Sequence, residues 1–119
     1  MKILITDSVK SDLLSIIKSE NSKKKFLLKI KEKINWNWWK NIFLKRPFIK
    51  IKVNFLNITF RIVAENNLEN NLVILMLFFK KSDKNFWENL VWNPELEKKI
   101  KSRMVQIQSD LLSDRYELI

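Results

Sequence analysis

The longest uninterrupted apolar run of the chain is the eight residues Leu72–Phe79. A helix that crosses a bilayer needs about 20 apolar residues, so this run is far too short to span a membrane. A strand that is buried on both of its faces shows such a continuous apolar run instead of an alternating one. We therefore expect Leu72–Phe79 to form a central strand of a sheet.

Two alternating segments precede this run. In Phe48–Val53, branched apolar residues alternate with lysines, which is typical of a half-buried strand. Ile58–Glu65 alternates in the same way, and Asn54–Asn57 connects the two segments as a hairpin. Asn66–Asn71 supplies the next turn, because asparagine tolerates the left-handed conformations that glycine would normally adopt. Met1–Ile5 predicts one further, short strand.

Other segments have helical periodicity. A helix capped by Asp7 or Ser8 is followed by the polar turn Ser19–Ser22 and a second helix, which predicts a helical hairpin. Asn93-Pro94 has the form of an N-cap followed by proline at the first helical position, so a third, long helix begins there. The expected inward-facing residues of the three helices are Val9, Leu13, Ile16 and Ile17; Phe26, Leu27, Ile30 and Ile34; and Leu96, Ile100, Met104, Ile107 and Leu111.

These elements predict an α+β fold in the order β-α-α-β-β-β-α. An N-terminal strand and a helical hairpin pack on a mainly antiparallel sheet, and a long C-terminal helix follows. We expect two layers, with the helices on one face of the sheet. A length of 119 residues without a linker or repeat predicts one domain. Asp83 is expected to cap a short helical segment that contains Phe86 and Trp87.

The composition excludes several kinds of site. The chain has no glycine, so it has no phosphate-binding glycine loop and no nucleophile elbow. Without cysteine or histidine it has no disulfide, no thiol nucleophile, no imidazole base and no zinc site of the usual kind. We expect no cofactor and no metal. Any catalysis would use Lys, Arg, Asp, Glu, Ser, Thr, Trp or the single tyrosine, Tyr116, to which we assign no role.

The positive charge is concentrated in one segment. Residues 18–52 contain twelve cations and two anions and so carry the whole net charge of +10. These cations are Lys18, Lys23, Lys24, Lys25, Lys29, Lys31, Lys33, Lys40, Lys45, Arg46, Lys50 and Lys52. Such a segment indicates a polyanionic partner. Mutational bias toward lysine is the alternative, but it would scatter the lysines along the chain. Because the N-terminus lacks the features of a secretory signal, we expect a cytoplasmic protein that does not associate with membranes.

Lys50, Lys52 and Arg61 are the residues that could perform chemistry. Alternation places both lysines on the open face of the sheet, and the connection Asn54–Asn57 would pair Lys50 directly with Arg61. Like charges opposite one another are unfavourable by up to about 1 kcal/mol, so their retention indicates that an anion binds between them. A solvated face with the cations pointing apart is an equally good interpretation.

Further cations and aromatic residues lie near this cluster. Lys80 and Lys81 end the apolar strand and could extend the same surface, or could simply protect the strand end from aggregation. Trp87 could stack on a base or pack in the core. Lys45 and Arg46 precede the lysine strand and are further candidates for RNA binding. Trp36, Trp38 and Trp39 also lie within the basic half, and at least one of these is expected to anchor the core.

This succession resembles the RelE/ParE superfamily of bacterial toxins. The resemblance covers about residues 1–90 and rests on the N-terminal strand, the helical hairpin, Lys50-Ile51-Lys52, Phe60-Arg61-Ile62-Val63 and Phe79-Lys80-Lys81. It implies that residues 1–119 form a single RelE-like toxin domain, with a core of about residues 1–90 and a C-terminal helix of about residues 94–114. Lys50, Lys52 and Arg61 match the RelE branch residue for residue. Lys81 stands where that branch has an arginine, and Trp87 where it has a tyrosine.

The resemblance implies an endoribonuclease that cleaves mRNA on the ribosome and is paired with an acidic antitoxin protein. In that chemistry the ribose 2′-OH attacks the adjacent phosphate. We assign Lys52 as the base, Arg61 and Lys50 as stabilisers of the phosphorane, and Lys81 as an acid or phosphate ligand. Lys45, Arg46, Lys80 and Trp87 are assigned to RNA binding. The changes at Lys81 and Trp87 leave open whether catalysis is retained.

Two alternatives remain. The chain could be a basic module or degenerate toxin that binds RNA or the ribosome without cleavage. It could also be a gyrase-poisoning toxin of the ParE branch, although that branch lacks the cluster of Lys50, Lys52 and Arg61.

Overall fold

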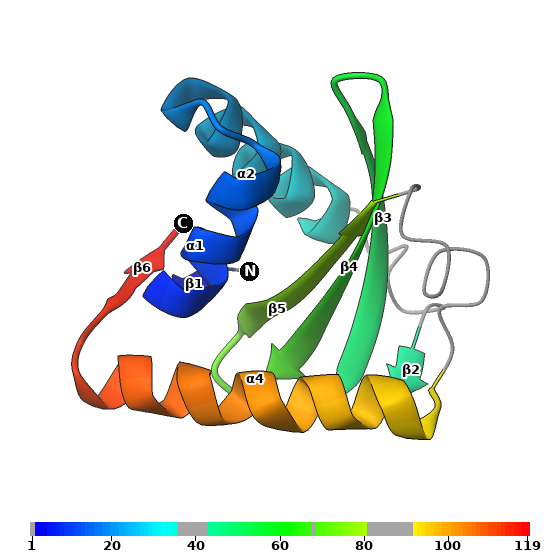
Figure 1. The fold of residues 1–119 in the computed structure, drawn as a ribbon, viewed down its shortest axis with the longest axis vertical. Coiled ribbons are helices and arrows are strands. Elements are labelled where there is room, and N and C mark those ends of the chain that lie inside the picture. The colour runs from blue at the N-terminus through cyan, green and yellow to red at the C-terminus, as the bar shows by residue number, and fades with distance from the viewer. Residues whose placement is uncertain (1, 36–42, 68, 81–91) are drawn as a thin grey trace.

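The computed structural model describes residues 2–35, 43–67, 69–80 and 92–119. The elements are β1 (Lys2–Thr6), α1 (Asp7–Ile16), α2 (Glu20–Asn35), β2 (Phe43–Lys45), β3 (Phe48–Phe55), β4 (Ile58–Asn67), β5 (Leu72–Lys80), α4 (Pro94–Leu112) and β6 (Tyr116–Leu118). Within the described residues the strands form one six-stranded sheet in the order β2-β3-β4-β5-β1-β6 (Figure 1). The predicted α+β fold, with a mainly antiparallel sheet and a C-terminal helix, is confirmed.

The apolar strand lies inside the sheet, as we predicted. β5 pairs antiparallel with β4 on one side and parallel with β1 on the other. Its residues Leu75–Phe79 are all buried, because layers of side chains cover both faces. Asn71, at the turn before β5, has a φ of 50°, so asparagine does adopt a left-handed conformation in place of glycine.

The β3–β4 hairpin is longer than we predicted and its turn is shorter. Pairing continues through Asn54–Thr59 to Phe55–Ile58, and the Thr59 hydroxyl donates a hydrogen bond to Asn54 Oδ1 over 2.8 Å. Leu56 and Asn57 alone form the turn, with φ values of 52° and 62°. Two left-handed residues at the tip are the arrangement of a type I′ turn, whose twist matches that of the strands. The prediction of a four-residue connection at Asn54–Asn57 is therefore wrong, since the turn consists of Leu56 and Asn57 alone.

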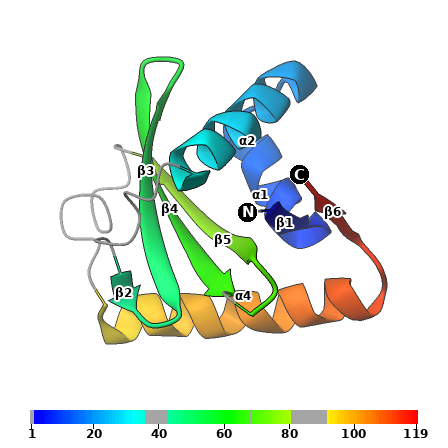
Figure 2. The same cartoon turned by 180° about the vertical axis from the view of Figure 1, so that it is seen from behind.

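The helices lie on both faces of the sheet, not on one. Phe26 of α2 packs edge-on against Phe60, with ring centroids 4.9 Å apart, and also contacts Phe55 and Phe78 on the same face. Met104 of α4 lines a cavity with Glu65, which belongs to the opposite face because it alternates with Ala64. Figures 1 and 2 show α2 beside the upper part of β3, β4 and β5, and α4 running across the lower ends of these strands. The expected two-layer arrangement is corrected to helix, sheet and helix, because an amphipathic stripe does not specify which face it covers.

α4 begins as its sequence predicts. The Asn93 side chain accepts a hydrogen bond from the Leu96 backbone N–H over 2.8 Å, and Pro94 occupies the first turn, where its missing N–H is not needed. Along the predicted stripe, Leu96, Ile100 and Ile107 are buried, while Met104 and Leu111 are half-buried against the core.

Strand β6 was not predicted and brings the two ends of the described chain together. It pairs antiparallel with β1, with Thr6 opposite Tyr116 and Leu4 opposite Leu118. Figure 2 shows β6 beside β1 at the edge of the sheet. Tyr116, to which we assigned no role, is thus part of the sheet, although its side chain is exposed.

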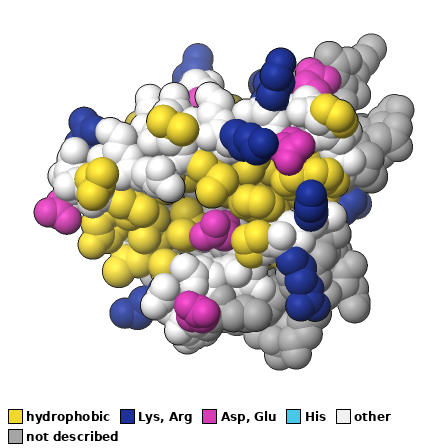
Figure 3. All heavy atoms as spheres, turned by 90° about the horizontal axis from the view of Figure 1, so that it is seen from below, with side chains coloured by type: hydrophobic (Ala, Val, Ile, Leu, Met, Phe, Trp, Pro, Cys, Tyr) yellow, Lys and Arg dark blue, Asp and Glu magenta, His cyan; other side chains and the backbone are white. Residues whose placement is uncertain are grey.

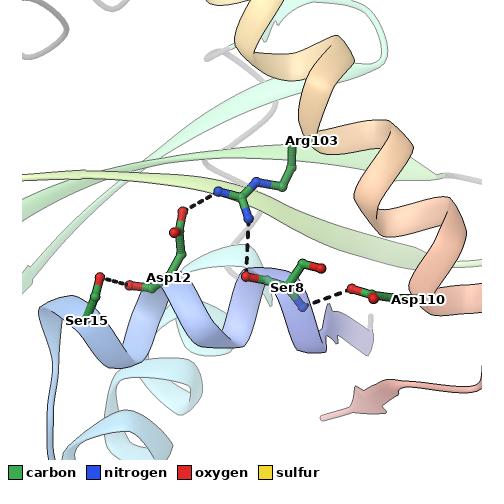
Figure 4. A network of polar contacts seen from close by, with 5 residues as sticks. All are labelled: Ser8, Asp12, Ser15, Arg103 and Asp110. Atoms are coloured by element: carbon green, nitrogen blue, oxygen red, sulfur yellow. Dashed lines mark hydrogen bonds and ion pairs between the residues drawn. The ribbon is translucent and has the colours of Figure 1, made fainter.

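Polar contacts fasten α4 to α1 (Figure 4). Arg103 donates to the Ser8 carbonyl over 3.2 Å and forms an ion pair with Asp12. Asp110, whose side chain is buried, accepts a hydrogen bond from the Ser8 backbone N–H over 2.9 Å. Burial would raise the pKa of the Asp110 carboxyl, but the hydrogen bonds from Ser8 and the charge of Arg115 outweigh it and lower the pKa. Asp110 is therefore charged at neutral pH and holds the C-terminal end of α4 in place.

Candidate nucleic-acid interface

Lys50, Lys52 and Arg61 lie on the same face of the sheet, as we predicted. Lys52 is exposed and lies directly opposite Arg61 in the β3–β4 ladder. Directly opposed residues of an antiparallel pair point to the same face, so the sheet does not separate the three cations. The alternating residues Ile51, Ile62 and Phe60 point to the other face and are buried against α2.

The pairing of these residues differs from the expected register. Lys50 lies opposite Val63, and Lys52 takes the place opposite Arg61 that we had assigned to Lys50. The two-residue turn at Leu56 and Asn57 shifts the register by two residues, which leaves every side chain on its predicted face. Lys50 and Arg61 are diagonal neighbours, at a separation of roughly 7–8 Å in a regular ladder and within reach of their long side chains.

Lys50 is the lysine of this cluster with a lowered pKa. Burial lowers the pKa of its ammonium group below the ordinary value of 10.5, and the positive charge of Arg61 lowers it further. A lowered pKa increases the fraction of neutral amine, which is the form that can accept a proton. This is the property that we attributed to Lys52, so Lys50 joins Lys52 as a candidate base.

Lys45 and Arg46 lie in a groove on the same side of the sheet. The groove, about 250 Å³ in volume, runs between β2, the start of β3 and the first turns of α4. Phe48 and Trp92 stack within it, with ring centroids 5.7 Å apart and an interplanar angle of 18°. Lys45 Nζ lies 5.2 Å from the centroid of the Trp92 ring. Phe48 and Trp92 were not predicted as site residues. The alternation of β3 could have indicated Phe48, because Phe48 and Lys50 lie two positions apart and therefore share one face of the sheet.

Lys80, by contrast, lies on the other face. It is paired with Phe60, which packs against Phe26 of α2, whereas the preceding Phe79 is paired with Arg61. The structure therefore does not bring Lys80 together with the cluster, because successive residues of a strand alternate in direction. Two other assigned residues, Lys81 and Trp87, lie outside the described residues, as do the expected helical segment at 83–87 and the three tryptophans at 36, 38 and 39.

The basic segment is divided between the two sides of the sheet. Most of its lysines belong to α2, which covers the face opposite to Lys50 and Lys52. One of them, Lys23, is buried and forms an ion pair with Glu20 over 2.8 Å. The positive charge beside Arg61 therefore comes from Lys50 and Lys52 of β3, and the exposed lysines of α2 lie on the other side of the sheet.

A polar cavity of about 280 Å³ is lined by Phe79, the residue of β5 that pairs with Arg61. Lys99, Ser102 and Gln106 of α4 line it, together with the Asp12–Arg103 ion pair. These α4 residues were not predicted as site residues, because the sequence does not indicate that α4 covers the face of the sheet that carries Arg61.

A third cavity, of about 260 Å³, holds an isolated carboxyl. Glu65 lies among Ile74, Met76, Met104 and Leu111, and burial raises its pKa above the ordinary value of 4.5. Seen from below, hydrophobic side chains gather on this side of the molecule, with Lys and Arg side chains around them (Figure 3). Glu65 lies four positions after Arg61 along β4, which is roughly 13 Å in an extended strand, so the two groups do not form one site.

Two further properties concern metals and membranes. Among residues 2–35, 43–67, 69–80 and 92–119, no group of three or more acidic, histidine or cysteine residues could hold a metal ion. Within the same ranges, no helix is both long and apolar enough to cross a membrane.

No protein-family model matches the chain, and no curated protein and no solved structure matches it either. The relation to RelE/ParE toxins therefore stays a prediction, which rests on the residues of β3 and β4 and on the order of the elements.

Proposed function

We propose that the chain is a ribosome-dependent endoribonuclease of a toxin–antitoxin pair, which binds mRNA on the face of β3 and β4 that carries Lys50, Lys52 and Arg61. The observation that carries the proposal is the direct opposition of Lys52 and Arg61 in the ladder, with Lys50 on the same face. Because opposed like charges destabilise a sheet, a phosphate that binds between them offsets a cost that the free protein bears.

The proposed reaction is a transesterification that needs neither metal nor histidine. The 2′-oxygen attacks the adjacent phosphorus, its proton passes to a lysine amine, and the bond from phosphorus to the 5′-oxygen breaks. The leaving 5′-oxygen takes up a proton from a protonated lysine or from water, so the products are a 2′,3′-cyclic phosphate and a 5′-hydroxyl. Arg61 and the lysine that stays charged stabilise the phosphorane. Lys50, with its lowered pKa, and Lys52 are the two candidates for the base.

The first experiment is primer extension on ribosome-bound mRNA after the protein is induced. We expect discrete cuts that disappear in Lys52→Ala and Arg61→Ala and persist in Lys24→Ala, a matched change on the exposed surface of α2. Thermal denaturation of Lys52→Ala and Arg61→Ala, compared with the wild type, separates loss of chemistry from unfolding. Cuts that persist in both variants would refute the site at Lys52 and Arg61, and wild-type arrest without cuts would refute the nuclease.

A second pair of variants assigns the base. Arginine keeps the positive charge of lysine but stays protonated, so it can replace a stabiliser and cannot replace a base. If Lys50 is the base, Lys50→Arg abolishes cleavage and Lys52→Arg retains much of it. The reverse result assigns the base to Lys52. Full activity of both variants would exclude both lysines from proton transfer.

Binding without cleavage is the second candidate function. It is favoured by the groove of Lys45, Arg46, Phe48 and Trp92, which combines cations with aromatic rings. Ribosome-bound protein that protects mRNA without cutting it would support this candidate.

A further inference from the structure

The groove beside Phe48 and Trp92 has a chemistry that the cleavage reaction does not use. Its two rings are nearly parallel, and both are half-buried, so part of each remains accessible. Lys45, Arg46 and Lys101 are exposed around them, and the carboxylate of Glu97, which also lines the groove, lies 3.8 Å from the Lys101 ammonium. The groove is therefore aromatic on its floor and predominantly positive at its rim.

The groove also continues the line of the cation cluster. Phe48, Lys50 and Lys52 occupy alternate positions of β3 and share one face. Successive residues on one face of a strand are roughly 7 Å apart. A single strand of RNA whose phosphate lies at Lys52 and Arg61 could thus run along β3 and reach Phe48 within a few nucleotides.

We propose that this groove is a base-stacking subsite for single-stranded RNA. One unpaired base lies against the Phe48–Trp92 pair, and Lys45, Arg46 and Lys101 contact the flanking phosphates. Aromatic rings bind unpaired bases of any sequence because every base has a π-face, whereas the bases of an RNA duplex are inaccessible to them. The subsite deepens the proposed function, on which it rests, by placing a bound nucleotide outside the reacting centre.

The experiment measures binding of a short single-stranded RNA that carries one 5-iodouridine, with the full-length protein. Photo-crosslinking followed by mass spectrometry should place the crosslink on Phe48 or Trp92 for at least one position of the label. The corresponding duplex should give no crosslink there. Crosslinks that map only to residues other than Phe48 and Trp92 would overturn the proposal.

Affinity supplies an independent measurement. The double variant Lys45→Ala/Arg46→Ala should bind the single strand at least tenfold more weakly. Its salt dependence should fall by about 1.4 in the slope of log K against log salt, which corresponds to two phosphate contacts. The matched control is Lys24→Ala/Lys25→Ala, which removes the same charge from exposed positions of α2 on the other side of the sheet.

The outcomes separate the subsite from the proposed function. If RNA binding depends on Lys52 and Arg61 while the two double variants behave alike, the subsite is wrong and the main site stands. If the wild-type protein binds no single-stranded RNA, the subsite is wrong, whereas the proposed function is decided separately by primer extension on ribosome-bound mRNA. Trp92→Phe keeps a ring in the groove and should retain most of the affinity, whereas Trp92→Leu removes the ring and should lose it. Equal affinities of these two variants would leave the rim a purely electrostatic role and overturn stacking.

Discussion

Lys52 and Arg61 lie directly opposite one another on neighbouring antiparallel strands, on the face of the sheet opposite to the buried residues Ile51, Phe60 and Ile62. Two like charges at this position cost the folded protein up to about 1 kcal/mol.

Reversal of one of these charges should therefore stabilise the fold. We expect Lys52→Glu to raise the free energy of unfolding by about 0.5–1 kcal/mol, because an attractive pair replaces a repulsive one. Urea denaturation measures it. Lys25→Glu, at an exposed position of α2, reports the general effect of lowering the net charge. Equal effects of the two changes would show that the opposition of Lys52 and Arg61 has no energetic consequence.

The pKa of Lys50 should depend on Arg61. Since the charge of Arg61 contributes to lowering it, Arg61→Ala should raise the pKa of Lys50 toward 10.5, while Arg61→Lys should leave it lowered. A lysine side-chain NMR titration measures both. The remaining shift in Arg61→Ala reports burial, which is the larger cause. An unchanged pKa in Arg61→Ala would mean that the two side chains point apart.

Leu56 should limit the stability of the hairpin. It has a φ of 52° and its side chain is 64% exposed, so it bears the steric cost of a left-handed conformation without compensation from burial. Leu56→Asn should raise the free energy of unfolding by about 1 kcal/mol, because asparagine tolerates this region. Leu56→Ala keeps the steric conflict and should give no such gain. If the alanine and asparagine variants are equally stabilised, the cost at this position comes from the exposed leucine side chain and not from the left-handed backbone.

Glu65 should destabilise the protein at neutral pH. Its pKa is raised in the folded state, so the folded protein binds the proton more tightly, and stability falls as the pH rises from 4.5 through that raised value. Glu65→Gln should therefore be more stable than the wild type at pH 7, and the difference should vanish below about pH 4.5. Thermal denaturation across this range measures it, with Glu69→Gln at an exposed turn as the control. A difference that is independent of pH would contradict the burial of a charged carboxylate.

Asp110 should have the opposite pH dependence. Its pKa is lowered in the folded state, so its contribution is fully present above its ordinary value of 3.8 and is lost as the pH falls through the lowered pKa. Asp110→Asn should reduce the free energy of unfolding at pH 7 by about 1.5–3 kcal/mol, since a charged hydrogen-bond acceptor is removed from a buried position. Glu95→Gln, exposed in the first turn of α4, should have a much smaller effect. Comparable losses in the two variants would refute the role of Asp110 as the anchor of α4.

The sequence was sufficient for those features that depend on periodicity. The alternation in β3 and β4 placed Lys50, Lys52 and Arg61 on one face, and this held even though the register was wrong, because a shift of two residues preserves the faces. The asparagine and proline at the start of α4 were equally informative, since their preference is local.

The features that were missed depend on tertiary packing. The stripe of α4 predicts a buried side but gives no information about which face of the sheet it covers. Strand β6 is three residues long and its side chains are exposed, so it leaves no hydrophobic pattern to detect. The stack of Phe48 on Trp92 joins residues far apart in the chain, and no spacing within either segment indicates it.

The position of β1 between β5 and β6 has a consequence for the order of assembly. Residues 2–6 are translated well before their neighbours in the sheet, which are residues 72–74 and 116–118. β1 therefore stays unpaired, with its apolar residues unprotected, until those later segments have been translated. Pairings of such long range make folding slow, so a chaperone or a binding partner that shields residues 2–6 on the nascent chain would increase the yield of native protein.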